Sequence, residues 1–228
     1  MRVKIILILV ISLTSINTFA QNEYKLGLLT QINTDISFEK KWKLNAKLEN
    51  RQIFYEGITG MPMNLQYEYE RSDIELVLTK KLNSIHTVGA GYLGRRKENG
   101  DIIHRFIQQY ALVQKTGNIR LAHRFRTDET FGKNEDFRFR LRYRISTDKA
   151  LEGQTIDEKE FYLKFSNEYL GSLKKNDVNF EIRGLAALGY NINDSNKIEA
   201  GLDYRMEEML SETKTHLGWL NLSWYYSF

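Results

Sequence analysis

The most informative segment of the chain reads Phe137-Arg138-Phe139-Arg140-Leu141-Arg142-Tyr143-Arg144-Ile145. Its odd-numbered residues are apolar and its even-numbered residues are all arginines. Successive side chains of a β-strand point to opposite faces of the sheet, so a strand separates the two sets completely. A helix, with about 3.6 residues per turn, mixes them on every side. The segment therefore predicts a strand with one apolar face and one strongly basic face.

The same period-two pattern recurs on both sides of this segment. Apolar and polar residues alternate over residues 42–49, 73–79, 161–166, 178–183 and 198–205. Polar clusters rich in Asn, Asp, Ser and Gly separate such segments, at residues 82–84, 97–101, 115–118 and 191–196. These residue types favour turns, because they tolerate left-handed backbone and form local hydrogen bonds. The pattern predicts an all-β protein built from consecutive hairpins.

The first twenty residues have the composition of an export signal. Arg2 and Lys4 precede an apolar run over residues 5–13, and Thr18-Phe19-Ala20 offers small residues at the positions that a signal peptidase reads. The run is shorter than the ~20 apolar residues of a membrane-spanning helix. We therefore expect a signal peptide over residues 1–20 and one barrel domain over residues 21–228.

Composition narrows the classes of protein that remain. The chain has no cysteine, which excludes disulfides and thiolate metal sites. Without Arg2 and Lys4, the 33 basic residues become 31 against 29 acidic ones. A nearly neutral mature chain gives no support to a nucleic-acid partner, so we expect none.

The last residues of the chain separate a membrane barrel from a soluble β-sandwich, which alternates in the same way. Apolar side chains stand at every second position from Leu220 through Leu222, Trp224 and Tyr226 to the terminal Phe228. A terminal aromatic residue with this spacing before it resembles the signal that the barrel-assembly machinery reads in outer-membrane proteins. We therefore expect an outer-membrane location, contact with outer-membrane lipid, and an assembly signal at Trp224, Tyr226 and Phe228.

The number of strands depends on one break in phase. Apolar residues occupy odd positions over residues 65–69 and even positions over residues 74–78. A shift of one residue moves every side chain to the other face, so either a bulge or a tight hairpin lies near Arg71-Ser72. A hairpin gives a transmembrane, antiparallel, up-and-down barrel of about 12 strands, the even parity that bacterial barrels favour. A bulge gives about eleven, and a first segment outside the barrel gives about ten. We expect twelve.

Several stretches of the sequence resemble one family. They are His104-Arg105-Phe106-Ile107-Gln108-Gln109, Leu121-Ala122-His123-Arg124-Phe125-Arg126-Thr127-Asp128, residues 137–145, and Glu160-Phe161-Tyr162 followed by Asn167-Glu168. They are similar to the DUF2490 family, uncharacterised outer-membrane barrels of Bacteroidetes. The resemblance implies a β-barrel in the outer membrane, and it implies no activity.

Arginines concentrate on one face of two neighbouring predicted strands. They are Arg124, Arg126, Arg138, Arg140, Arg142 and Arg144. A charged side chain that faces lipid costs about 2–4 kcal/mol near the middle of the bilayer. We therefore place all six in the lumen, where they form a ladder of guanidinium groups, named here the arginine ladder.

The arginine ladder allows two interpretations. In the first, acidic side chains neutralise it and the barrel is structural. The candidate partners are Glu75, Glu168, Glu181, Glu199 and Asp203. In the second, an unpaired ladder makes a narrow, porin-like pore for small anionic solutes, because guanidinium groups bind carboxylate and phosphate with two parallel hydrogen bonds.

An enzyme of the outer leaflet, of the hydrolase or acyltransferase type, is the alternative. Such an enzyme needs a nucleophile beside a base, or two carboxylates with a water. The four histidines, at positions 86, 104, 123 and 216, lie in no GxSxG or HExxH pattern. Strand phase places His123 on the outward face. We therefore assign no catalytic residue, no metal ligand and no cofactor.

Overall fold

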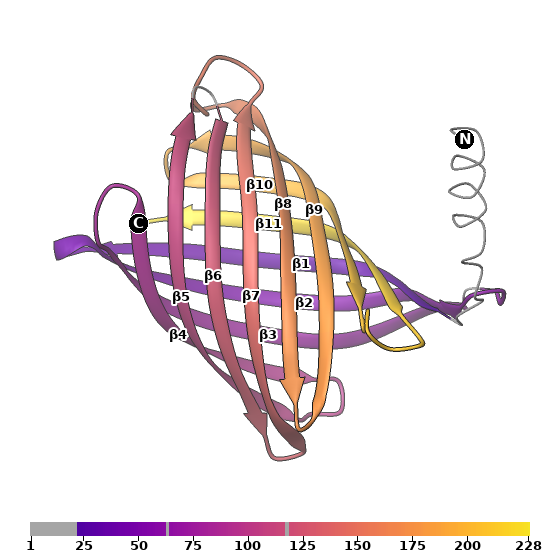
Figure 1. Cartoon of the computed structure of the whole chain (residues 1–228). Coiled ribbons are helices and arrows are strands. Elements are labelled where there is room, and N and C mark those ends of the chain that lie inside the picture. The colour runs from indigo at the N-terminus through magenta and orange to yellow at the C-terminus, as the bar shows by residue number, and fades with distance from the viewer. Residues whose placement is uncertain (1–21, 63, 117–118) are drawn as a thin grey trace, which may run out of the picture.

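The computed structural model describes residues 22–62, 64–116 and 119–228, which form one closed β-barrel (Figure 1). Its strands are β1 (Glu23–Phe38), β2 (Trp42–Ile58), β3 (Asn64–Lys81), β4 (His86–Lys97), β5 (Ile102–Thr116), β6 (Ile119–Gly132), β7 (Glu135–Ala150), β8 (Glu160–Lys174), β9 (Asp177–Asn193), β10 (Asn196–Glu207) and β11 (Thr215–Ser227). A short 3-10 helix, η1 (Glu39–Lys41), joins β1 to β2. The predicted signal peptide lies outside the described residues. No helix in the described part of the chain is long and apolar enough to cross a membrane.

Each strand pairs antiparallel with the next strand in the sequence, and the barrel closes where β1 pairs with β11. That closing pair is parallel, with Glu23 opposite Thr215 and Asp35 opposite Ser227. Ten antiparallel steps join the eleven strands, so the first and last strands run in the same direction and pair in parallel. The barrel therefore has an N-terminal end, where β1 begins, and a C-terminal end, where β11 finishes.

The break in phase near Arg71 is a bulge inside β3. Arg71 lies opposite Arg51 and Tyr69 lies opposite Gln52, so Glu70 is an extra residue on one strand. An extra residue restores the apolar set to the outer face without a reversal of the chain. The expectation of an all-β, antiparallel barrel is confirmed, and the described residues form eleven strands where we expected twelve.

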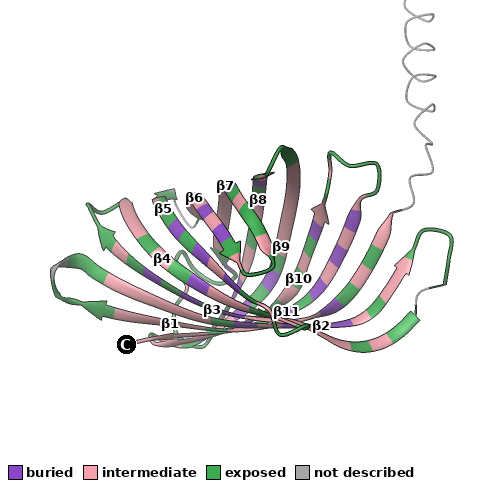
Figure 2. Cartoon of the chain, turned by 90° about the horizontal axis from the view of Figure 1, so that it is seen from below, coloured by how far each residue is buried: buried purple, intermediate pink, exposed green. Residues whose placement is uncertain are grey.

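Outward and inward faces follow the alternation of the sequence. On β7, Phe137 is 59% exposed on the outside, whereas Arg140 is 8% exposed in the interior. Figure 2 shows buried and exposed residues in turn along several strands. The outer face is built mainly from large apolar side chains that are exposed in the isolated chain. Apolar surface on this scale marks a region that something else covers.

Apolar side chains also fill part of the interior. One buried cluster on β1, β2 and β11 consists of Leu29, Ile53, Leu217 and Trp219. A second cluster on β3, β4 and β5 consists of Val77, Leu93 and Ile107. The Arg51 guanidinium lies 5.3 Å from the centre of the Trp219 ring, a cation–π contact that joins the first cluster to the charged part of the lumen.

Gly189 on β9 makes room for a buried ring. Its cross-strand partner is Tyr162 of β8, and a Cβ at position 189 would overlap the Tyr162 ring. The Tyr162 hydroxyl donates a hydrogen bond of 2.8 Å to the Glu199 carboxylate. Glycine therefore allows the close approach that positions this hydrogen bond.

We predict that Gly189→Ala lowers the free energy of unfolding by about 1–3 kcal/mol, because overpacking displaces the Tyr162 ring. Urea unfolding of the detergent-folded protein measures the change. Gly184→Ala on the same strand is the control, since a Cβ there meets no atom within 4 Å. Equal stability of the two variants would show that the ring does not need the glycine.

Candidate functional site

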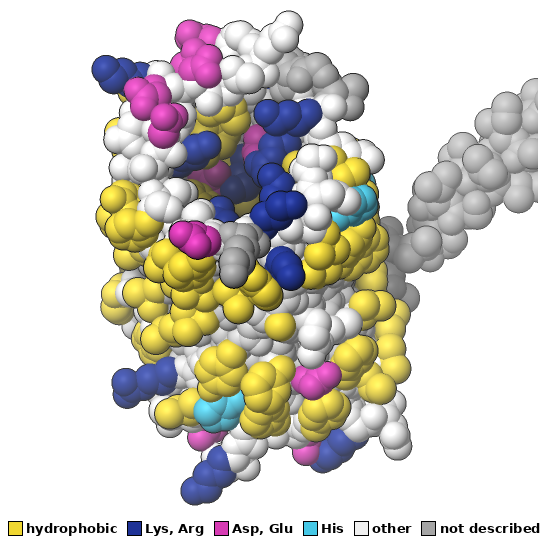
Figure 3. Space-filling view, turned by 90° about the vertical axis from the view of Figure 1, so that its left-hand side faces the viewer, with side chains coloured by type: hydrophobic (Ala, Val, Ile, Leu, Met, Phe, Trp, Pro, Cys, Tyr) yellow, Lys and Arg dark blue, Asp and Glu magenta, His cyan; other side chains and the backbone are white. Residues whose placement is uncertain are grey.

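A cavity of about 510 Å³ occupies the lumen, and residues from every strand line it. Figure 3 shows the barrel hollowed at one end, with Lys and Arg side chains around the hollow. The basic lining residues are Lys43, Lys47, Arg51, Arg71, Arg95, Arg105, Arg124, Arg126, Arg138, Arg140, Arg142, Arg144, Lys164, Arg183 and Arg205. The acidic ones are Asp35, Glu49, Asp73, Glu75, Glu168, Glu181, Asp203 and Glu207. Fifteen cations of the lining thus face eight anions of the lining, and four further acids, Glu70, Asp128, Glu135 and Glu199, also pair with lining cations.

All six residues of the arginine ladder line this cavity. Strands β6 and β7 set their register, which puts Arg124 directly opposite Arg144 and Arg126 directly opposite Arg142. Like charges directly opposite one another on a sheet are unfavourable. The two strands therefore need negative charge nearby in order to pair.

Asp128 supplies much of that charge. It is 0% exposed and accepts from Arg126 Nε at 2.7 Å and from Arg142 Nη1 at 3.1 Å, and Arg140 Nη2 lies 3.4 Å away. One carboxylate thus serves three guanidinium groups. The candidate partners taken from the sequence did not include Asp128. Its position in phase with Arg124 and Arg126 was the available signal.

Glu168 and Glu75 also compensate part of the ladder. Glu168 pairs with Arg142 at 2.5 Å and with Arg124 at 3.2 Å. Glu75 of β3 accepts two hydrogen bonds from Arg126, at 2.7 and 3.1 Å, although two strands separate β3 from β6 around the barrel wall. This bidentate pair links β3 to β6 on the inside of the barrel, past β4 and β5.

The other three acidic candidates also face inward but pair with cations outside the ladder. Their pairs are Glu181 with Arg183 at 2.5 Å, Glu199 with Lys164 at 2.8 Å, and Asp203 with Arg205 at 2.8 Å. Two further pairs that the sequence did not predict are Glu49 with Arg51 at 2.5 Å and Asp73 with Arg95 at 2.6 Å. The acids of the lumen are therefore distributed around the whole wall.

Two cavity-lining arginines, Arg105 and Arg144, form no ion pair with any described residue. Arg144 Nε is buried without a hydrogen-bond partner in the part of the chain that the structure describes. Because carboxylates such as Asp128 and Glu168 are shared, pairing leaves an excess of guanidinium N–H donors. This excess is the chemical property of the site: it attracts anions.

The histidines lie away from this cavity. Each one hydrogen-bonds a tyrosine hydroxyl on a neighbouring strand: His86 with Tyr110, His104 with Tyr92, His123 with Tyr143, and His216 with Tyr204. His123 lies on the outward face, as its strand phase predicts. Within the described residues, no group of three or more His, Asp or Glu side chains is arranged to hold a metal ion.

We predict that Asp128→Asn lowers the free energy of unfolding by about 3–5 kcal/mol, because three buried guanidinium groups lose their shared counter-charge. Urea unfolding in detergent provides the measurement. Asp177→Asn, at the exposed start of β9, is the control and leaves stability unchanged. A loss below about 1 kcal/mol for Asp128→Asn would mean that the ladder does not depend on this carboxylate.

Comparison with known proteins gives one match. The model of a family described as "Protein of unknown function (DUF2490)" matches residues 26–216, which run from β1 into β11. No match is found among curated proteins or among solved structures. The family match covers far more than half of the chain, and the resemblance seen in the short motifs is confirmed. The chain therefore belongs to the DUF2490 family.

Proposed function

We propose that this protein is an outer-membrane β-barrel whose lumen admits small anions as a narrow pore. The observation that carries the proposal is the basic excess of the cavity, where fifteen lining cations meet eight lining acids and four more acids that pair with them. A cleft lined by one sign of charge between walls of low dielectric constant concentrates counter-ions. Small anions in the surrounding water are therefore drawn into the lumen.

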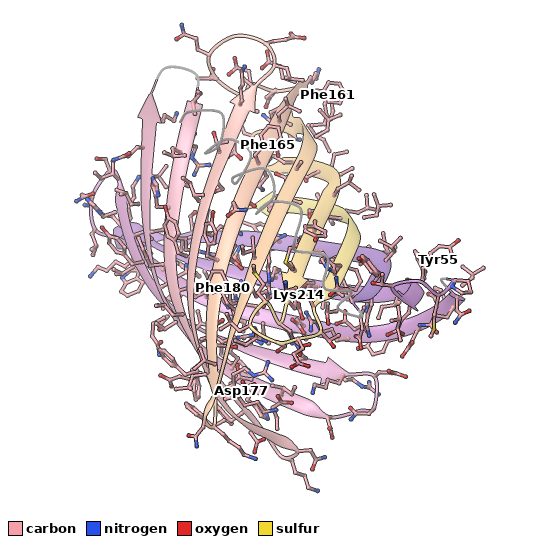
Figure 4. All side chains as sticks on the ribbon, turned by 45° about the vertical axis from the view of Figure 1, so that its right-hand side comes forward. Tyr55, Phe161, Phe165, Asp177, Phe180 and Lys214 are labelled. Atoms are coloured by element: carbon pink, nitrogen blue, oxygen red, sulfur yellow. The ribbon has the colours of Figure 1, made fainter. Side chains whose placement is uncertain are left out.

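The outer surface supports the membrane location. Exposed aromatic residues lie near both ends of the barrel. Toward the C-terminal end they include Trp42, Phe161, Trp224 and Phe228, and toward the N-terminal end they include Tyr24, Phe137 and Tyr204. Figure 4 shows Phe161 near one end of β8 and Asp177 at the opposite end of the barrel. Aromatic girdles at both interfaces around an apolar band are typical of barrels in the outer membrane.

The cavity reaches close to the C-terminal end. Its lining includes Lys43, one residue after the start of β2, and Asp35, three residues before the end of β1. Arg144 and Arg124 follow further inside, and Arg144 has no ion pair with a described residue. An anion that enters from this end therefore meets the Arg144 guanidinium, which lacks an ion pair within the described chain, before it reaches Asp128.

Conductance in planar bilayers tests the pore. Under a gradient of potassium chloride, we expect a reversal potential that indicates anion selectivity. In the double variant Arg124→Gln, Arg144→Gln, the chloride-to-potassium permeability ratio falls about thirtyfold, because each of the two lost charges contributes about 1 kcal/mol of attraction in water. Arg96→Gln, on the outward face of β4, is the control and keeps the wild-type ratio.

Two results would overturn the proposal. A protein shown to be folded by its heat-modifiable gel mobility, yet silent in the bilayer, is not a pore. Recovery of the native protein in the soluble periplasm would remove the membrane location itself.

The proposed location also depends on assembly, which deletion of Phe228 tests. The Phe228 ring is 69% exposed, so it adds little to packing within the chain. We expect the deletion variant to refold in detergent like the wild type but to disappear from the outer membrane of cells, as measured by fractionation. Phe137→Ala removes an equally outward ring elsewhere, and this control reaches the outer membrane. Normal assembly without Phe228 would show that the terminal residue is not the signal.

A further inference from the structure

Two buried arginines meet at one hydroxyl group. Arg105 of β5 donates from Nε to Thr130 Oγ1 at 3.1 Å, and Arg140 of β7 donates from Nη2 to the same oxygen at 3.4 Å. Thr130 lies on β6, between those two strands. Arg105 is 4% exposed and Arg140 is 8% exposed, and both line the cavity. Two guanidinium groups therefore lie together at the cavity wall with a hydroxyl group between them.

The charge of this pair is poorly compensated. Arg105 has no ion pair with any residue that the structure describes, and Arg140 has one, with Asp128 at 3.4 Å. That carboxylate already accepts shorter hydrogen bonds from Arg126 and Arg142. Arg140 Nε is buried and has no hydrogen-bond partner in the described chain. Buried N–H donors of charged groups are normally satisfied, so this position lacks an acceptor.

The hydroxyl group completes a set of convergent donors. Because Thr130 Oγ1 accepts from both arginines, its own hydrogen is free to donate to a third group. An anion at the cavity wall would then receive guanidinium N–H groups from two sides and an O–H group between them. The planar fork of a guanidinium group matches the oxygen spacing of carboxylate and phosphate.

We infer that Arg105, Arg140 and Thr130 bind one small oxyanion, a phosphate or carboxylate group, inside the lumen. The inference rests on the proposed function and deepens it, since it identifies where an admitted anion is held. Arg105 was not part of the predicted ladder, because it stands alone among uncharged neighbours in its strand phase.

Calorimetric titration of the detergent-folded mature chain with inorganic phosphate, in a chloride-free buffer, tests the site. Wild-type protein is expected to bind one phosphate per chain with a saturable curve. Arg105→Gln combined with Arg140→Gln abolishes the binding. Thr130→Val weakens it about tenfold, the effect of losing one hydrogen bond to a charged group. Arg96→Gln, outside the lumen, binds phosphate as the wild type does.

Absence of binding to the folded wild type would overturn the inference, and so would equal binding by the double variant. Thr130→Val keeps both charges, so it carries the test if the double variant does not fold; unchanged affinity in Thr130→Val then refutes the site. The titration involves no membrane. A protein that binds phosphate but passes no current therefore refutes the pore alone, and a protein that conducts but binds no phosphate refutes this site alone.

Discussion

The shared carboxylates of the lumen are the interactions on which the barrel wall depends. Strands β6 and β7 pair in a register that sets Arg124 against Arg144 and Arg126 against Arg142. Two unit charges about 4 Å apart repel by about 4 kcal/mol at an effective dielectric constant of about 20. Asp128 lies within this register and Glu168 lies on the next strand, so attraction replaces repulsion where the strands meet. Hydrogen bonding between the backbones and charge pairing between the side chains therefore stabilise the same seam.

These ion pairs stabilise the fold but leave an excess of positive charge in the lumen. Structural pairing explains most of the lining, since thirteen of its fifteen cations have an acidic partner among the described residues. The sharing of carboxylates explains the remaining positive charge. A carboxylate such as Asp128, with three guanidinium partners, cannot accept from all of their N–H groups. The structural interpretation and the proposed anion interpretation of the ladder therefore concern different groups in one lumen: the paired groups stabilise it, and the residual donors are those on which the proposed anion binding rests.

Alternation in the sequence predicted faces better than it predicted partners. It placed Phe137 and Arg140 correctly because period two depends only on the strand itself. It located the break near Arg71 but not its nature, since a bulge and a hairpin change the phase in the same way. The pair of Glu75 with Arg126 joins residues 51 positions apart, and strand curvature and stagger set such contacts on the inside of the barrel. Glu199 faces inward as expected, yet the same geometry brings it to Lys164 and away from the ladder.

Because the number of strands is odd, β1 and β11 pair in parallel and together close the barrel. β1 has no sequential neighbour on one edge, and β11 covers that edge from Glu23 to Asp35. The pairing continues to the last residue, where the Phe228 amide donates to the Asp35 carbonyl at 2.8 Å. Without β11, β1 would expose unpaired backbone groups along that edge, and such groups need hydrogen-bond partners. Without β11, the charged side chains of the lumen would also be open to the surroundings on that side. β11 therefore both completes the hydrogen-bond ladder of the barrel and closes the wall around the arginines.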